Sequence, residues 1–156
     1  MAQVTAVTDH HIEAPLAAVR SAIADYEAVR PRILTDHYGG YRVLEGGTGE
    51  GTVASWTLQA TQKRSRDVVA DVTVTDDGDV VETDRNSSMV TTWSTHAHGD
   101  VTHVTLTTTW KGAGGIGGFF EKTFAPKGLG RIQDELLRRL EAEVRGGGEP
   151  VAGAVG

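Results

Sequence analysis

Hydrophobic and polar residues alternate along most of this chain, which is the period of a β-strand with one buried face. Residues 4–12 predict a first strand, with Val4 and Ala6 on one face. Six further strands are expected at 38–45, 51–60, 64–75, 79–85, 88–96 and 101–110. Pairs of turn-forming residues such as Asp77-Gly78 separate them at short intervals. The run therefore predicts an antiparallel meander.

The period changes to that of a helix in three places. Ala14-Pro15 opens a first short helix, because proline fits the first turn of a helix. A second short helix is expected over 26–34, interrupted near Pro31. A long C-terminal helix is expected over 119–144, kinked or broken in its first half by Pro126 and Gly128. Its apolar stripe consists of Phe120, Phe124, Leu129, Ile132, Leu136, Leu140 and Val144.

The expected order is one strand, two short helices, six strands and a long helix, which describes an α+β domain. We expect one domain over residues 1–145 and a disordered tail over 146–156. One helix can cover seven strands only if it lies in the concave face of a bent sheet.

Composition narrows the class of protein. The 156 residues contain no cysteine, so disulfides and thiolate metal sites are excluded, and a cytoplasmic location is expected. The formal net charge of -6, with scattered basic residues, argues against nucleic-acid binding. The first residues show no signal peptide or membrane span.

Several stretches carry a family resemblance: residues 12–15, 23–26, 46–52, 87–93 and 110–121. With these motifs, residues 3–145 resemble the START and polyketide cyclase/dehydrase superfamily, and in particular actinobacterial members of unassigned role. The resemblance implies a helix-grip fold, a seven-stranded curved antiparallel sheet wrapped around a long C-terminal helix. The superfamily includes cyclases, aromatases, lipid carriers and hormone receptors, so the resemblance does not choose among them.

Strand parity predicts which side chains face the helix. Pairing around Asp77-Gly78 is expected to set Val74 opposite Val81, which turns Thr83 and Arg85 inward and Glu82 and Asp84 outward; a one-residue bulge would reverse this. The expected ligand-binding wall is Trp56, Leu58, Val68, Val72, Val81, Thr83, Met89, Thr91, Trp93, Leu106, Thr108, Trp110, Phe120 and Phe124. An apolar wall with a few polar groups is typical of ligand pockets, although three tryptophans also suit a plain core.

Four residues are candidates for chemistry. Arg66 and Arg85, if they face inward, can hold an enolate or carboxylate oxygen by forked hydrogen bonds. His37 and Tyr26 are candidates for proton transfer near the pocket mouth. The alternative is that the arginines lie at exposed strand ends and that His37 is a solvated loop residue.

No metal or cofactor is expected. The six histidines include no pair at metal-binding helical spacing. The glycine-rich loop 112–118 lacks the Lys-Ser/Thr ending of a nucleotide loop, and we interpret it as a flap over the cavity, with Phe119 and Phe120 at its base.

Three functions follow. The first is a cofactor-independent, polyketide cyclase/dehydrase-like enzyme that acts on a lipophilic carbonyl compound by general acid–base chemistry. The second is a non-catalytic carrier or sensor of a hydrophobic ligand. The third is a protein-interaction module with a filled core. The sequence leaves the ligand and the oligomeric state open, and a homodimer is among the partners it allows.

Overall fold

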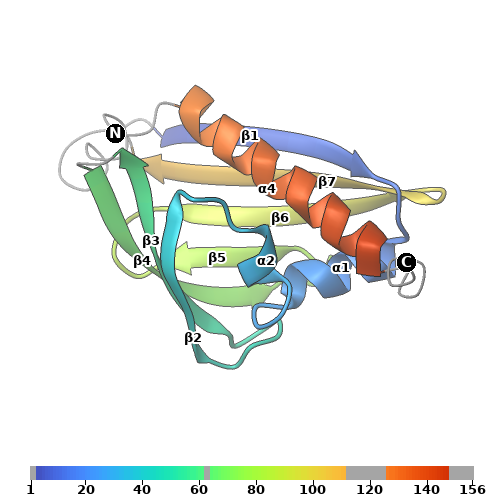
Figure 1. Ribbon diagram of the computed structural model, residues 1–156, viewed down its shortest axis with the longest axis horizontal. Coiled ribbons are helices and arrows are strands. Elements are labelled where there is room, and N and C mark those ends of the chain that lie inside the picture. The colour runs from blue at the N-terminus through green and yellow to red at the C-terminus, as the bar shows by residue number, and fades with distance from the viewer. Residues whose placement is uncertain (1–2, 62–63, 112–125, 148–156) are drawn as a thin grey trace.

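The computed structural model describes residues 3–61, 64–111 and 126–147 (Figure 1). Its elements are β1 (Gln3–Ile12), α1 (Leu16–Ala24), α2 (Arg30–Ile33), β2 (Tyr38–Glu45), β3 (Val53–Thr61), β4 (Arg64–Val74), β5 (Val80–Asp84), β6 (Val90–His98), β7 (Val101–Lys111) and α4 (Pro126–Gly147). The predicted order of strands and helices is confirmed. None of the described helices is long and apolar enough to cross a bilayer.

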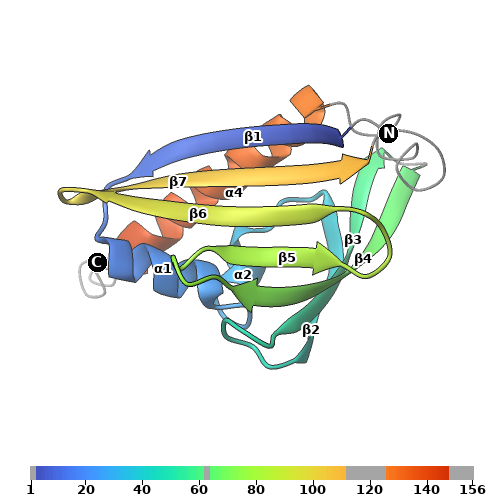
Figure 2. The same cartoon turned by 180° about the vertical axis from the view of Figure 1, so that it is seen from behind.

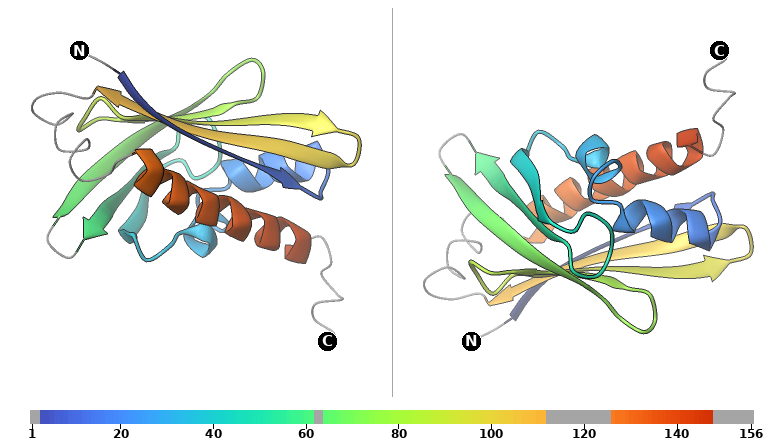
Figure 3. Two further views of the ribbon diagram at one scale, coloured as in Figure 1. Left: turned by 90° about the horizontal axis from the view of Figure 1, so that it is seen from above. Right: turned by 90° about the horizontal axis from the view of Figure 1, so that it is seen from below.

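The seven strands form one antiparallel sheet in the order β1-β7-β6-β5-β4-β3-β2. Figure 1 shows α4 lying across one face of this sheet, and Figure 2 shows the opposite face with α4 behind it. In Figure 3 the sheet bends, so that β2, β3 and β4 run at a steep angle to β1, β6 and β7. This arrangement confirms the predicted helix-grip fold.

The core fills the concave face of the sheet. Trp93, Leu106 and Trp110 are buried there almost completely. They face a stripe of α4 whose buried members are Leu129, Ile132, Leu136, Leu137 and Leu140. The steps of three and four residues in that stripe explain why this segment forms a helix with one buried side.

The limits of the helices differ from the prediction. The second short helix spans only Arg30–Ile33, because Asp25 accepts hydrogen bonds from the backbone N–H of Glu27 (3.1 Å) and Ala28 (2.8 Å) and holds a turn there. In α4, Gly128 causes no break within Pro126–Gly147. Phe120, Phe124, the loop 112–118 and the tail 148–156 lie outside the described residues.

The last hairpin has the predicted register. Thr91 pairs with Thr108 and Trp93 pairs with Leu106, which places all four on the concave face. Each of these pairs joins β6 to β7 directly, so a single set of inward positions continues across both strands.

The hairpin between β4 and β5 has a different register, so the predicted facing of β5 was wrong. Val74 pairs with Val80 rather than Val81. The connection is one residue shorter than expected, because the N–H of Thr75 donates to Asp79 O and closes the loop (2.9 Å). Gly78 takes a left-handed φ of 88° inside it.

A shift of one residue moves every side chain of a strand to the other face. Val80, Glu82 and Asp84 are therefore buried on the concave side, whereas Thr83 and Arg85 are exposed on the convex side. The interior therefore contains Glu82, and Arg85, which was predicted to face inward, is exposed.

Candidate ligand-binding site

The concave face of the sheet, α2 and the first half of α4 enclose a largely apolar cavity. The described residues that line it are Arg30, Leu34, Tyr38, Trp56, Leu58, Glu82, Met89, Thr91, Trp93, Leu106, Thr108, Leu129, Gln133 and Leu136. Its volume is about 40 Å³. A buried water needs about 10–15 Å³ on this measure, so the cavity has room for only a few water molecules.

A buried ion pair forms one end of the cavity wall. Arg30 on α2 donates from Nη1 to Glu82 Oε2 on β5 at 2.6 Å, and their exposed fractions are 3% and 6%. The same oxygen accepts the hydroxyl of Tyr26 at 2.6 Å and the indole N–H of Trp93 at 3.3 Å. Three donors on one oxygen offset the cost of burying the carboxylate.

Two aromatic rings hold the guanidinium in place. The Cζ atom of Arg30 lies 4.3 Å from the centroid of Tyr26 and 4.7 Å from that of Trp93. Burial opposes the charge of Arg30, but Glu82 outweighs it and raises the arginine pKa. Burial, reinforced by Glu82, raises the pKa of Tyr26 well above its ordinary value. Arg30 is thus a fixed cation and Tyr26 a neutral hydrogen-bond donor.

A row of polar side chains continues from this pair across the sheet. Glu82 is the cross-strand neighbour of Thr91, which in turn neighbours Thr108. The hydroxyls of Thr91 and Thr108 are 2.9 Å apart, and Thr108 donates to Gln133 Oε1 on α4 at 2.5 Å. The amide of Gln133 donates onward to Leu106 O at 3.2 Å. This row satisfies its own hydrogen bonds.

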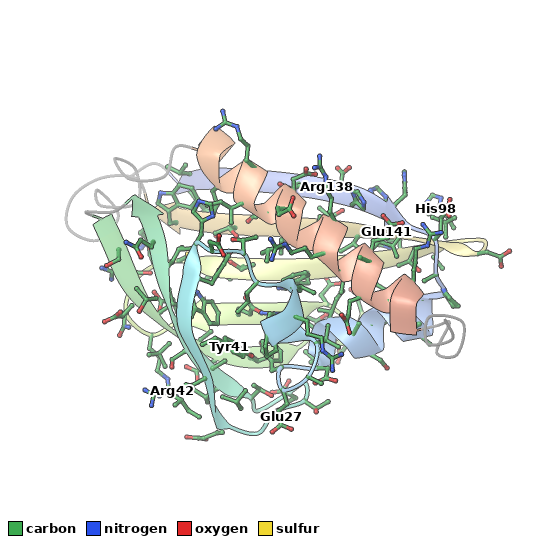
Figure 4. All side chains as sticks on the ribbon, viewed as in Figure 1. Glu27, Tyr41, Arg42, His98, Arg138 and Glu141 are labelled. Atoms are coloured by element: carbon green, nitrogen blue, oxygen red, sulfur yellow. The ribbon has the colours of Figure 1, made fainter. Side chains whose placement is uncertain are left out.

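Polar atoms of the wall that have no hydrogen-bond partner among the described residues include one of Trp56 and one of Glu82. The indole N–H of Trp56 is buried and makes no hydrogen bond there. Glu82 Oε1 likewise forms none with that part of the chain. The ring of Trp56 lies near those of Tyr38 and Tyr41, with centroids 6.3 and 6.2 Å away, and Tyr41 is labelled on β2 in Figure 4. An unpaired buried donor favours occupation of the site by a hydrogen-bond acceptor.

The predicted ligand-binding residues fall into four groups. Seven line the cavity: Trp56, Leu58, Met89, Thr91, Trp93, Leu106 and Thr108. Val68, Val72 and Trp110 are buried on the same face without being among the described lining residues, and Val81 and Thr83 face outward. Phe120 and Phe124 lie outside the described residues. Contact of any of these side chains with a ligand stays a prediction.

The four predicted catalytic residues do not come together. Arg85 is exposed and forms a bidentate pair with Asp71, so its inward orientation was wrong. Arg66 donates to Asn86 O at the end of β4, and His37 lies beside Thr35. Neither is among the described residues that line the cavity. Tyr26 alone reaches the polar end of the site, through its hydrogen bond to Glu82.

Sequence reasoning missed Arg30, Glu82 and Gln133. Gln133 did carry a signal, because it is a polar residue inside the apolar stripe of α4. The burial of Glu82 could have been predicted from the correct register of β4 and β5. Arg30 had no sequence signal, since its burial depends on the packing of α2 against β5.

The buried carboxylate of Asp84 plays a structural part outside the cavity wall. Asp84 is buried but accepts three hydrogen bonds, from the N–H of Val69 and of Asn86 and from the hydroxyl of Ser87, and so fixes the turn after β5. Among the described residues no group of three or more histidines or acids is arranged to hold a metal ion. His98 lies at the end of β6, by the hairpin to β7, and is not among the described lining residues (Figure 4).

Several solved protein structures have a fold similar to that of this chain. The NMR structure of a protein named KanY is 57% identical to this chain, covers 94% of it and 100% of its own chain, and has a TM-score of 0.85. The Zhui aromatase/cyclase from Streptomyces sp. R1128 is 14% identical, covers 93% and 95%, and has a TM-score of 0.69. A START superfamily protein from Mycobacterium smegmatis is 14% identical, covers 90% and 97%, and has a TM-score of 0.65.

The last two structures are too distant in sequence to show more than the fold. No curated protein matches the chain significantly. The family model described as polyketide cyclase/dehydrase and lipid transport matches residues 1–145, nearly the whole chain. The chain therefore belongs to the polyketide cyclase/dehydrase and lipid transport family.

Proposed function

We propose that this protein binds a lipophilic small molecule, bearing a carbonyl or similar acceptor, between its sheet and α4. The observation that carries the proposal is the buried N–H of Trp56, a residue of the largely apolar cavity wall, which has no hydrogen-bond partner among the described residues. A family that comprises cyclases, dehydrases and lipid-transport proteins supports the same role. The apolar wall supplies affinity, and the few polar atoms orient the ligand.

Ligand binding requires the wall to move. Ligand pockets commonly measure about 300–1,000 Å³, well above the 40 Å³ enclosed here. Met89 and the leucines Leu34, Leu129 and Leu136 line the cavity. These side chains are not branched at Cβ and can change rotamer. We expect a ligand to displace them and to separate α4 from the sheet.

The test is a titration with N-phenyl-1-naphthylamine, a neutral apolar dye that fluoresces when it leaves water. We expect one dye per chain. A matched pair of variants locates the site: Thr91→Phe fills the cavity from β6, whereas Thr92→Phe adds the same ring on the opposite face of the strand.

Thr91→Phe should weaken dye binding at least about tenfold, and Thr92→Phe should leave it unchanged, with circular dichroism verifying that both variants fold. Equal affinities in both variants would place the dye elsewhere. A wild-type protein that binds no dye would favour the filled-core interaction module instead.

Catalysis is a second candidate function, favoured by Glu82 in the cavity wall, whose Oε1 accepts no hydrogen bond from the described residues. A carboxylate there can remove a proton from the carbon next to a bound carbonyl, while a donor such as Trp56 N–H holds the enolate oxygen. Proton removal at such a carbon is the first step shared by cyclisations and dehydrations of carbonyl compounds.

The chemical test is hydrogen–deuterium exchange at the methyl group of 2-acetylnaphthalene in D₂O, followed by mass spectrometry. We expect the wild-type protein to accelerate exchange and Glu82→Gln to abolish the acceleration while 2-acetylnaphthalene still binds. If the wild-type protein binds 2-acetylnaphthalene but does not accelerate its exchange, the result would contradict catalysis and favour a carrier or sensor.

A further inference from the structure

The part of the cavity wall formed by described residues is electrically neutral, because its two charges cancel. Arg30 and Glu82 are the charged side chains among its described lining residues, and they are bonded to each other at 2.6 Å. Both are buried, so solvent screens them little. A ligand therefore meets a closed dipole rather than a free cation.

The guanidinium is also unavailable for geometric reasons. Its Cζ atom lies over the rings of both Tyr26 and Trp93, and Nη1 is bonded to Glu82. Nη2 lies 3.5 Å from Ile23 O, a contact inside the protein. A carboxylate on a ligand could pair with Arg30 only by displacing Glu82, which would leave that carboxylate buried without its cation.

We propose that the site selects uncharged ligands and rejects their anions, and that Glu82 is the residue that determines this specificity by neutralising Arg30. The inference rests on the proposed ligand-binding function and narrows it. The ligand class is a neutral, mostly apolar molecule whose carbonyl, hydroxyl or amide meets the free polar atoms of the wall. Fatty acids and other carboxylates are excluded, because the one cation among the described lining residues, Arg30, is already paired with Glu82 and cannot replace their lost hydration.

Two nearly isosteric probes test the inference: 2-naphthamide, which is neutral, and 2-naphthoate, which is an anion at neutral pH. Their dissociation constants are measured by displacement of the neutral dye. We expect the wild-type protein to bind 2-naphthamide at least about tenfold more tightly than 2-naphthoate.

The variant Glu82→Gln keeps a side chain of the same shape and leaves Arg30 with an unbalanced charge. We expect it to bind 2-naphthoate at least about tenfold more tightly than the wild-type protein does, with little change for 2-naphthamide. Glu45→Gln is the control, because it removes one negative charge from an exposed position of β2. It should leave both affinities unchanged.

The outcomes separate the inference from the proposed function. Equal or tighter binding of 2-naphthoate by the wild-type protein would overturn the neutral selectivity and leave a lipophilic site in place. Failure of the dye and both probes to bind would refute the proposed function itself. If Glu82→Gln does not fold, the ranking of the two probes on the wild-type protein still decides the selectivity.

Discussion

At the scale of single residues, Glu82 lies on a short strand, yet its carboxylate bonds to three separate segments of the interior. It joins α2 through Arg30, the turn after α1 through Tyr26, and β6 through Trp93. A buried carboxylate is tolerated only when such donors replace water. Removing one partner therefore leaves the other uncompensated.

Arg30→Met should lower the free energy of unfolding by about 3–5 kcal/mol, because Glu82 would remain buried without its cation. The double variant Arg30→Met/Glu82→Leu should recover most of that loss, since no buried charge is left. Urea denaturation of the two variants and of Glu82→Leu measures the coupling.

The exposed pair of Arg85 and Asp71 provides the control. Arg85→Met should leave the denaturation midpoint almost unchanged, because solvent screens that pair. Additive losses in the buried double variant would contradict the coupling between Arg30 and Glu82.

The three tyrosines predict a response to alkaline pH. Tyr26, Tyr38 and Tyr41 all have raised pKa values, each chiefly through burial, and that of Tyr41 reaches about 12. Above pH 10, the ordinary pKa, the unfolded chain releases these protons and the folded chain keeps them. Stability from this source is thus complete below pH 10 and falls as pH rises beyond it.

A spectroscopic titration checks this prediction. We expect almost no phenolate absorbance from the native protein between pH 10 and the onset of Tyr41 ionisation near 12, and full phenolate absorbance in denaturant over the same range. Titration of the native tyrosines near pH 10 would show that they are not buried as described.

At the scale of elements, the hairpin of β4 and β5 decides which side chains enter the site. A pair of lysine substitutions tests its register. Val80→Lys should unfold or strongly destabilise the protein, because Val80 is only 4% exposed, whereas Val81→Lys should be tolerated on the convex face. Thermal melts of both variants are compared. A stable Val80→Lys together with an unstable Val81→Lys would support the register expected from sequence.

The strands and their order could be predicted because turn residues and alternation are local signals. The register of β4 and β5 could not, because it depends on whether the N–H of Thr75 closes the loop onto Asp79. The last hairpin was predicted correctly since the turn between His98 and Val101 is short and allows little choice. In these two hairpins, the inward-facing residues were predicted correctly across the short loop and wrongly across the longer one.

At the scale of the whole molecule, the order of elements predicted an α+β domain with one helix in the concave face of a bent sheet, and the family resemblance identified this arrangement as the helix-grip fold. The apolar wall contributed by β3, β6 and β7 was predicted from strand parity. The ion pair could not be predicted from the sequence, because Arg30 and Glu82 are distant in the chain and meet only when α2 packs over β5. Interior polar contacts of this kind depend on tertiary packing rather than on local pattern.

The central claim is that the space between the sheet and α4 holds a neutral lipophilic ligand. The most direct test is native mass spectrometry of the freshly purified protein, with solvent extraction and identification of any retained molecule. The account predicts an uncharged, largely apolar compound at one per chain, or an empty protein that takes up one molecule of 2-naphthamide. A retained carboxylate would contradict the selectivity assigned to Glu82, and an empty protein that binds neither 2-naphthamide nor the neutral dye would contradict the claim of a ligand site.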